Sequence, residues 1–227
     1  MNWYIERLIG IILRPIFFFQ DMPGGSWQED SLSFALVTGW ILSFILTFVI
    51  FVNSYIPTGL SLIEGIYGKR LIIVLPVLLI MGFVFFAMSL LIIAGIMIIA
   101  IIALFMVCAA ILNFLLVLLG GTGNVFEVIK ASFYATAAVL AGVINILSMI
   151  LVKYKVMSIE NWITGERVIF YLTSVFLYGM FSIIGRKTHK VSRAKAFLAA
   201  TIPFILLVLF NIVFSAKVLP KVASILG

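Results

Sequence analysis

The sequence predicts an all-α polytopic membrane protein: a transmembrane helical bundle of five spans, with six as the alternative, and an amphipathic N-terminal in-plane helix. Hydrophobic residues make up 65% of the 227-residue chain and charged residues only 10%, far from the balance of a soluble domain. Eight acidic and fifteen basic side chains are too few to cover a soluble globule. Long runs carry no charge, and the basic residues gather at their ends.

The first predicted element is the amphipathic segment WYIERLIGIILRPIFFFQDM near the start of the chain. Glu6, Arg7, Gly10 and Arg14 recur at three- and four-residue spacing among apolar residues. Such a segment can lie along the membrane interface with its aromatic side in the lipid. A secretory signal is the alternative, but Arg14 and Pro15 interrupt the apolar run and no small-residue cleavage site follows.

The spans are predicted from stretches without Asp, Glu, Lys, Arg or His, because about 20 helical residues cross an apolar layer of about 30 Å. We expect spans near 31–52, 127–151, 168–185 and 196–216, plus one or two between 71 and 119. Two of these helices have capping-box spacing at their start, formed by Ser26 with Glu29 and by Asn124 with Glu127.

The block at 71–119 is too long for one crossing by about a factor of two. A hairpin near Ala94 and Gly95 would give six spans, although that point lacks the polar residues that interfacial turns favour. In the alternative, 97–119 spans while 71–93, with Pro76 as a kink, is re-entrant or packed against the bundle.

A basic loop joins the last two predicted spans in the stretch GRKTHKVSRAKAF. Its five cations are Arg186, Lys187, Lys190, Arg193 and Lys195. Lysine and arginine favour the cytoplasmic side, so this loop is expected inside, although the fifteen basic residues divide eight to seven between the two sides. We expect the loop to contact lipid phosphates, with an acidic partner as the alternative, and we expect His189 to be an exposed surface residue.

Catalytic and cofactor sites are not predicted. No acidic pair, metal-ligand cluster or nucleophile with a base stands at motif spacing, and GGTGN at 120–124 lacks the lysine of a phosphate loop, which makes it a flexible turn. Cys108 is alone in an apolar run and is expected to be a buried hydrophobe. Nucleic-acid binding is not expected, because the basic residues lack interleaved aromatics.

Polar residues inside the spans predict helix-to-helix contacts. The three asparagines are Asn113, Asn145 and Asn211, whose alternative role is a polar layer through which a small solute would pass. Pairs of small residues four apart predict that the helix containing Asn145 packs centrally: Ala131 with Ala135, and Ala138 with Gly142.

Three stretches of the chain resemble the Yip domain family of Ypt/Rab-interacting membrane proteins, in its short prokaryotic form: RPIFFFQDMPGG, AAILNFLLVLLGGTGNVFEVIKASFYATA and YLTSVFLYGMFSIIGRKTHKVSRAKAFLAATIPF. The resemblance implies five spans with a cytoplasmic amino terminus and no catalytic residue. It implies small-GTPase binding and vesicle traffic for eukaryotic relatives, which we do not expect here without their long cytosolic amino-terminal region. Some prokaryotic relatives accompany exporters. Many of them have histidine where Asn113 stands.

We therefore predict one Yip-like membrane domain over 1–227, with an interfacial helix and linker at 1–25, the bundle at 26–216 and a tail at 217–227. The predicted function is a non-enzymatic scaffold or accessory protein of a transport or trafficking complex, with a small-solute transporter or channel as the alternative. Expected partners are the lipid bilayer and a membrane protein, such as an exporter, or a second copy, in a bacterial-type plasma membrane. The predicted contact residues are the five loop cations together with Trp3, Arg7 and Arg14.

Overall fold

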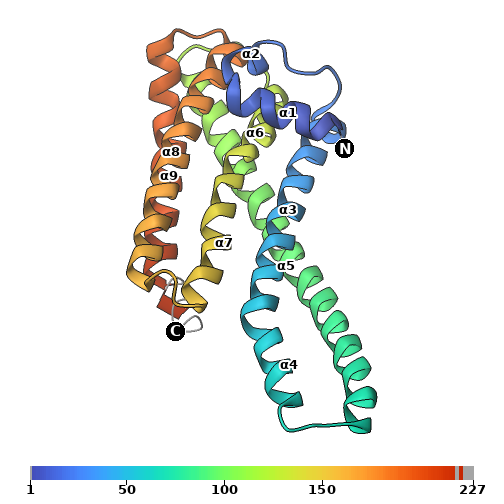
Figure 1. Cartoon of the computed structure of the whole chain (residues 1–227). Coiled ribbons are helices and arrows are strands. Elements are labelled where there is room, and N and C mark those ends of the chain that lie inside the picture. The colour runs from blue at the N-terminus through green and yellow to red at the C-terminus, as the bar shows by residue number, and fades with distance from the viewer. Residues whose placement is uncertain (1, 218–219, 222–227) are drawn as a thin grey trace.

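In the computed structural model, which describes residues 2–217, 220 and 221, every regular element is a helix (Figure 1). Five helical stretches of the described chain are long and apolar enough to span a membrane: Trp27–Ile63, Arg70–Leu118, Val125–Lys153, Ile159–His189 and Arg193–Lys217. They alternate in direction, so α1 (Asn2–Leu13) and the last residues of α9 (Arg193–Lys217) lie at opposite ends of the bundle (Figure 1). The prediction of an all-α bundle with five spans is confirmed. Most of the predicted tail lies outside the described residues.

Two short helices lie across one end of the bundle, namely α1 (Asn2–Leu13) and α2 (Pro15–Gln20). The loops at 119–124 and 190–192 lie at the same end (Figure 1). We term this end, formed by α1, α2 and these two loops, the capped end. Because it carries the basic loop, it is the end that the charge pattern predicts to face the cytoplasm.

The first span is longer than predicted. It begins with a π-helical turn (Trp27–Ser31) and α3 (Leu32–Ile50), then continues through a second π-helical turn (Phe51–Tyr55) into α4 (Ile56–Ile63). Its start is capped as expected, because the Ser26 hydroxyl oxygen accepts a hydrogen bond from the Glu29 backbone N–H at 3.3 Å.

The second span, α5 (Lys69–Leu118), is a single helix of 50 residues. The predictions of a hairpin near Ala94 and Gly95, and of a separate element at 71–93, are both wrong. A break there would leave backbone N–H and C=O groups without partners in a stretch where Ser89 has the only hydroxyl or amide side chain that could satisfy them. Pro76 lies inside α5 as its eighth residue and lacks the backbone N–H that would bond the Ile72 carbonyl, yet the helix continues through it.

The third span consists of α6 (Val125–Ala135), a 3-10 turn (Thr136–Ala141) and α7 (Gly142–Lys153). Every residue from 130 to 138 is buried, which confirms that this helix packs centrally. It begins at Asn124, whose side-chain oxygen accepts from the Phe126 N–H at 3.0 Å.

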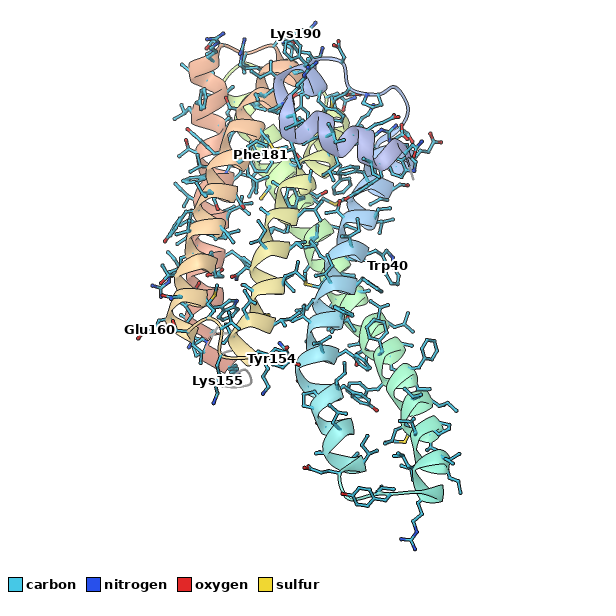
Figure 2. All side chains as sticks on the ribbon, in the orientation of Figure 1. Trp40, Tyr154, Lys155, Glu160, Phe181 and Lys190 are labelled. Atoms are coloured by element: carbon cyan, nitrogen blue, oxygen red, sulfur yellow. The ribbon has the colours of Figure 1, made fainter. Side chains whose placement is uncertain are left out.

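The last two spans are α8 (Ile159–His189) and α9 (Arg193–Lys217), packed side by side. Helix α8 starts well before the predicted boundary at 168, because Ser158 caps it by accepting a hydrogen bond from the Asn161 N–H at 3.2 Å. Figure 2 shows Tyr154, Lys155 and Glu160 at the end of the bundle opposite Lys190. We term that end of the bundle, around the turn at 154–158, the open end.

Candidate functional site

Helix α1 is docked on the bundle by Tyr4. The Tyr4 hydroxyl lies 2.9 Å from the Thr38 hydroxyl oxygen in α3, and the Tyr4 ring stacks on Phe34 with centroids 4.7 Å apart. Burial raises the pKa of the Tyr4 hydroxyl, while the hydrogen bond to Thr38 opposes this shift. The hydroxyl therefore keeps its proton at neutral pH and can donate to Thr38.

Arg7 joins α1 to the start of the first span. Its guanidinium lies 3.3 Å from the Asp30 carboxylate, 5.0 Å from the Trp3 ring centroid and 5.8 Å from that of Tyr134. Ion pairing and cation–π contacts thus hold this side chain against the protein. Arg7 and Trp3 are both predicted as lipid or partner contacts, and in the structure they contact each other.

The outer face of α1 and α2 is mostly apolar, with Glu6 exposed among its side chains. Exposed side chains on this face are Ile5, Ile9, Ile12, Leu13, Ile16 and Phe17. Arg14 is exposed beside them and makes no side-chain bond within the described part of the chain. The aromatic side chains divide between two environments, since Tyr4 and Phe19 are buried in the protein while Phe17 points outward. An amphipathic pattern cannot separate these two faces, because both are mostly apolar.

The basic loop divides into two groups of cations. The Lys187 ammonium donates to the Gln20 carbonyl at the end of α2, and the Lys195 ammonium donates to the Leu119 carbonyl at the end of α5 at 2.7 Å. Both satisfy backbone carbonyls at helix carboxyl ends, where positive charge is favourable. The second group, Arg186, Lys190 and Arg193, is exposed and has no acidic partner among the described residues.

His189 is 1% exposed, so the prediction of an exposed surface residue is wrong. Its Nδ1 accepts a hydrogen bond from the Gly123 N–H at 3.1 Å, and its Nε2 lies 3.0 Å from the Asn113 side-chain oxygen. Because Nδ1 accepts, the proton resides on Nε2 and is donated to Asn113. The imidazole is therefore neutral and joins the end of α8 to α5 and to the loop before α6.

The glycine-rich loop packs tightly against the end of α8. A Cβ atom on Gly123 would lie 2.1 Å from the Thr188 carbonyl oxygen, and one on Gly121 would lie 2.7 Å from the His189 Cβ. Glycine is required at both positions for this close approach. The stretch predicted to be a flexible turn is therefore a fixed contact. The local sequence pattern does not indicate this contact, because the glycines are far from His189 in the sequence.

Asn113 lies far from the other two predicted asparagines, which bond residues one turn apart on α8. Asn113 bonds His189 at the capped end, whereas the Asn145 backbone carbonyl accepts from the Trp162 indole N–H at 3.1 Å near the start of α8. The Asn211 amide donates to the Glu166 carboxylate at 3.3 Å. Glu166 and His189 stand about 35 Å apart along α8 at 1.5 Å per residue. The structure therefore does not bring the asparagines into one polar layer.

Glu166 is a partly buried carboxylate that the span boundaries missed, because it lies just outside the predicted 168–185. One carboxylate oxygen bonds Asn211, and the other is buried and has no hydrogen-bond partner among the residues that the structure describes. A cavity of about 280 Å³ lies nearby between α8 and α9, lined by Arg167, Tyr171, Asn211, Ile212, Ser215 and Ala216. Within the described residues, no three His, Cys, Asp or Glu side chains could hold a metal ion together.

The chain matches a known protein family over most of its length. The family model of the Yip1 domain matches residues 9–215, which include the basic loop, the glycine-rich loop and nearly the whole of the five spans. No curated protein and no solved structure matches the chain. This match covers most of the chain and agrees with the resemblance that three of its stretches show to the Yip domain family. The chain belongs to the Yip1 domain family.

Proposed function

We propose that this Yip1 domain protein is a non-enzymatic accessory component of a membrane complex, and that its capped end binds an acidic segment of a membrane-protein partner. One observation carries the proposal: Arg186, Lys190 and Arg193 are exposed and lack an acidic partner among the described residues. Charged groups arranged in this way favour association with a surface of opposite charge and select against others.

The capped end is suited to this role because its surroundings hold the three cations in place. Lys187 and Lys195 attach the basic loop to the ends of α2 and α5, and His189 attaches it to Asn113. A cation presented from a fixed backbone loses less conformational freedom on binding than one on a mobile loop. The bonds within the capped end thus support binding by the exposed cations.

Lipid contact and orientation are part of the same proposal. The mostly apolar outer face of α1 and α2 would lie in the headgroup region of the cytoplasmic leaflet of a bacterial-type plasma membrane, with Arg14 beside lipid phosphates. Each cation near an anionic leaflet contributes about 1 kcal/mol. Anionic lipids alone would attract these cations whatever their arrangement. A protein partner would instead require the particular geometry of the three exposed cations.

The test is a charge-neutralised variant compared with a matched control at the other end. In the test variant Arg186, Lys190 and Arg193 become glutamine, and in the control Lys153, Lys155 and Lys217 become glutamine. Each is crosslinked in native membranes and purified, and the attached proteins are identified by mass spectrometry. We expect a specific membrane protein to be retained with the native chain and the control and lost with the test variant.

Two outcomes would contradict the proposal. In the first, the same proteins are retained by all three forms, which would leave the exposed cations without a partner. In the second, the purified protein alone moves a solute across liposomes. The distance of Asn113 from Asn145 and Asn211 gives that second outcome no support, because a continuous polar path would need all three near one another.

A further inference from the structure

The hairpin between the first two spans extends past the rest of the molecule. We term residues 54–81 the arm: they comprise α4, the turn at 64–68 and the first part of α5. Figure 1 shows the arm continuing well beyond the ends of α7, α8 and α9. No described side chain of the arm is buried, whereas every other long helix contributes to the core.

The root of the arm is well defined. Asn53 donates its amide N–H to the Met149 carbonyl in α7 at 3.3 Å, and within the described part of the chain no hydrogen bond joins the hairpin to the bundle beyond it. At the same level the rings of Phe51 and Tyr55 stack, with Tyr55 also stacked on Phe85. From this level to its first residue, Lys69, α5 extends for about 20 Å at 1.5 Å per residue.

The arm has no charged side chain between its root and its tip. Its exposed hydroxyl side chains are those of Ser54, Thr58 and Ser61, of which the last two donate to backbone carbonyls of their own helix at 2.8 Å. The run LIIVLPVLLIM at 71–81 has no polar residue, and Ile72, Ile73 and Leu79 are 73%, 71% and 65% exposed. A hairpin that stood in water would keep a face of charged side chains. Charged side chains occur instead at the tip, where Glu64 and Arg70 are exposed beside Tyr67, and tyrosine and arginine are types that membrane interfaces favour.

We propose that the lipid bilayer covers the arm, which lies within the hydrocarbon of the leaflet at the open end with its tip among the headgroups. Because α5 is about 75 Å long and the hydrocarbon layer only about 30 Å thick, a hairpin parallel to the bundle axis would leave the arm in water. The arm must therefore lean toward the membrane plane, away from α7.

The root of the arm contains features that allow its two helices to bend toward the membrane plane. Phe51–Tyr55 is a π-helical turn, Pro57 follows it, and Gly82 faces it from α5. π-Helical turns, proline and glycine are the usual places where helices bend. A Cβ on Gly82 would lie 3.2 Å from the Tyr55 ring, so the two helices can approach closely where they turn together.

The test uses single cysteines in purified protein reconstituted into vesicles of phosphatidylcholine and phosphatidylglycerol. Cys108, the only cysteine, is first replaced by alanine. Ile73→Cys and Leu79→Cys report on the arm. Val156→Cys, in the exposed turn at the open end, is the water control, and Leu172→Cys, an exposed side chain midway along α8, is the lipid control. A membrane-impermeant maleimide is then applied to both sides.

Maleimide reacts with the thiolate, which hydrocarbon disfavours, so we expect both arm positions to react roughly tenfold or more slowly than position 156 and at the rate of position 172. Fluorophores attached in detergent at 73 and 79 should then be quenched by lipids that carry a nitroxide on the acyl chain.

The proposal is overturned if positions 73 and 79 react as fast as 156. It is also overturned if they are protected in native membranes but reactive in the pure lipid vesicles, since a protein would then cover the arm. A second copy as the cover would give slow reaction without quenching by nitroxide lipids. The cations of the capped end are unchanged in these variants and no partner is present, so the result is independent of the proposed function.

Discussion

The two halves of α5 have similar hydrophobicity and opposite surroundings. Near the capped end Phe105, Cys108, Ala109, Leu112 and Leu116 are buried, whereas no residue from 71 to 81 is. The two halves differ in the size of their side chains and in the presence of a hydrogen-bonding group, not in overall hydrophobicity. The buried half contains alanine, cysteine and an asparagine, which let helices approach and bond, while the segment 71–81 has only large apolar residues and one proline.

This comparison shows that hydrophobicity alone does not determine packing in a membrane. Lipid tails are as apolar as leucine, so an apolar side chain gains little by leaving lipid for protein. Close packing, interhelical hydrogen bonds and helix-end contacts decide instead where the helices associate. The capped end has all three, and the arm has none beyond its own two helices.

The largest expected effect comes from a glycine at the capped end. In Gly123→Ala the new Cβ would lie 2.1 Å from the Thr188 carbonyl oxygen, so we expect a loss of about 3 kcal/mol in the free energy of unfolding. The matched control is Gly59→Ala in the arm, which has nothing within 4 Å and should instead gain up to about 1 kcal/mol. Unfolding of purified protein in mixed micelles measures both. Equal stability of the two variants would remove the contrast between the ends.

A second pair of variants compares the halves of α5 directly. Leu112→Ala removes a fully buried side chain and should cost about 3 kcal/mol in the free energy of unfolding. Leu79→Ala, which is 65% exposed, should change that energy by less than about 0.5 kcal/mol. The same micelle unfolding assay applies. If Leu79→Ala costs as much as Leu112→Ala, the arm is packed against protein.

The bond between His189 and Asn113 should have a smaller, coupled effect. Either His189→Ala or Asn113→Ala leaves a buried polar group without its partner, at a cost of about 1–3 kcal/mol. The double variant should cost less than the sum of the two, because the lost bond is then counted once. A double-mutant cycle in micelles measures this coupling. Additive costs would mean that the two side chains act separately.

The smallest predicted effect is at α1. Tyr4→Phe removes the hydrogen bond to Thr38 and should lower the free energy of unfolding by about 1 kcal/mol. Tyr67→Phe at the tip of the arm, where the side chain is 83% exposed, is the control and should have no measurable effect. Proteolysis of the amino-terminal segment provides a second measurement, since release of α1 should speed its cleavage in the Tyr4 variant alone.

Much of the fold followed from local patterns. Charge-free runs predicted the five spans, and Ser26 predicted the start of the first one, because helix length and capping depend on neighbouring residues only. The small-residue pairs predicted the central helix, since close packing needs little side-chain volume. The candidate site was less accessible, because each of its bonds joins segments far apart in the chain.

The sequence by itself determined that this chain is a helical membrane protein with a basic loop between its last two spans, because apolar length and charge position are local properties. Only the tertiary structure decided which loop cations bond to helix ends, that His189 is buried against Asn113 and Gly123, and that α5 is one unbroken helix. Those outcomes depend on which helix ends meet and on how buried backbone groups find partners, and neither can be read from neighbouring residues.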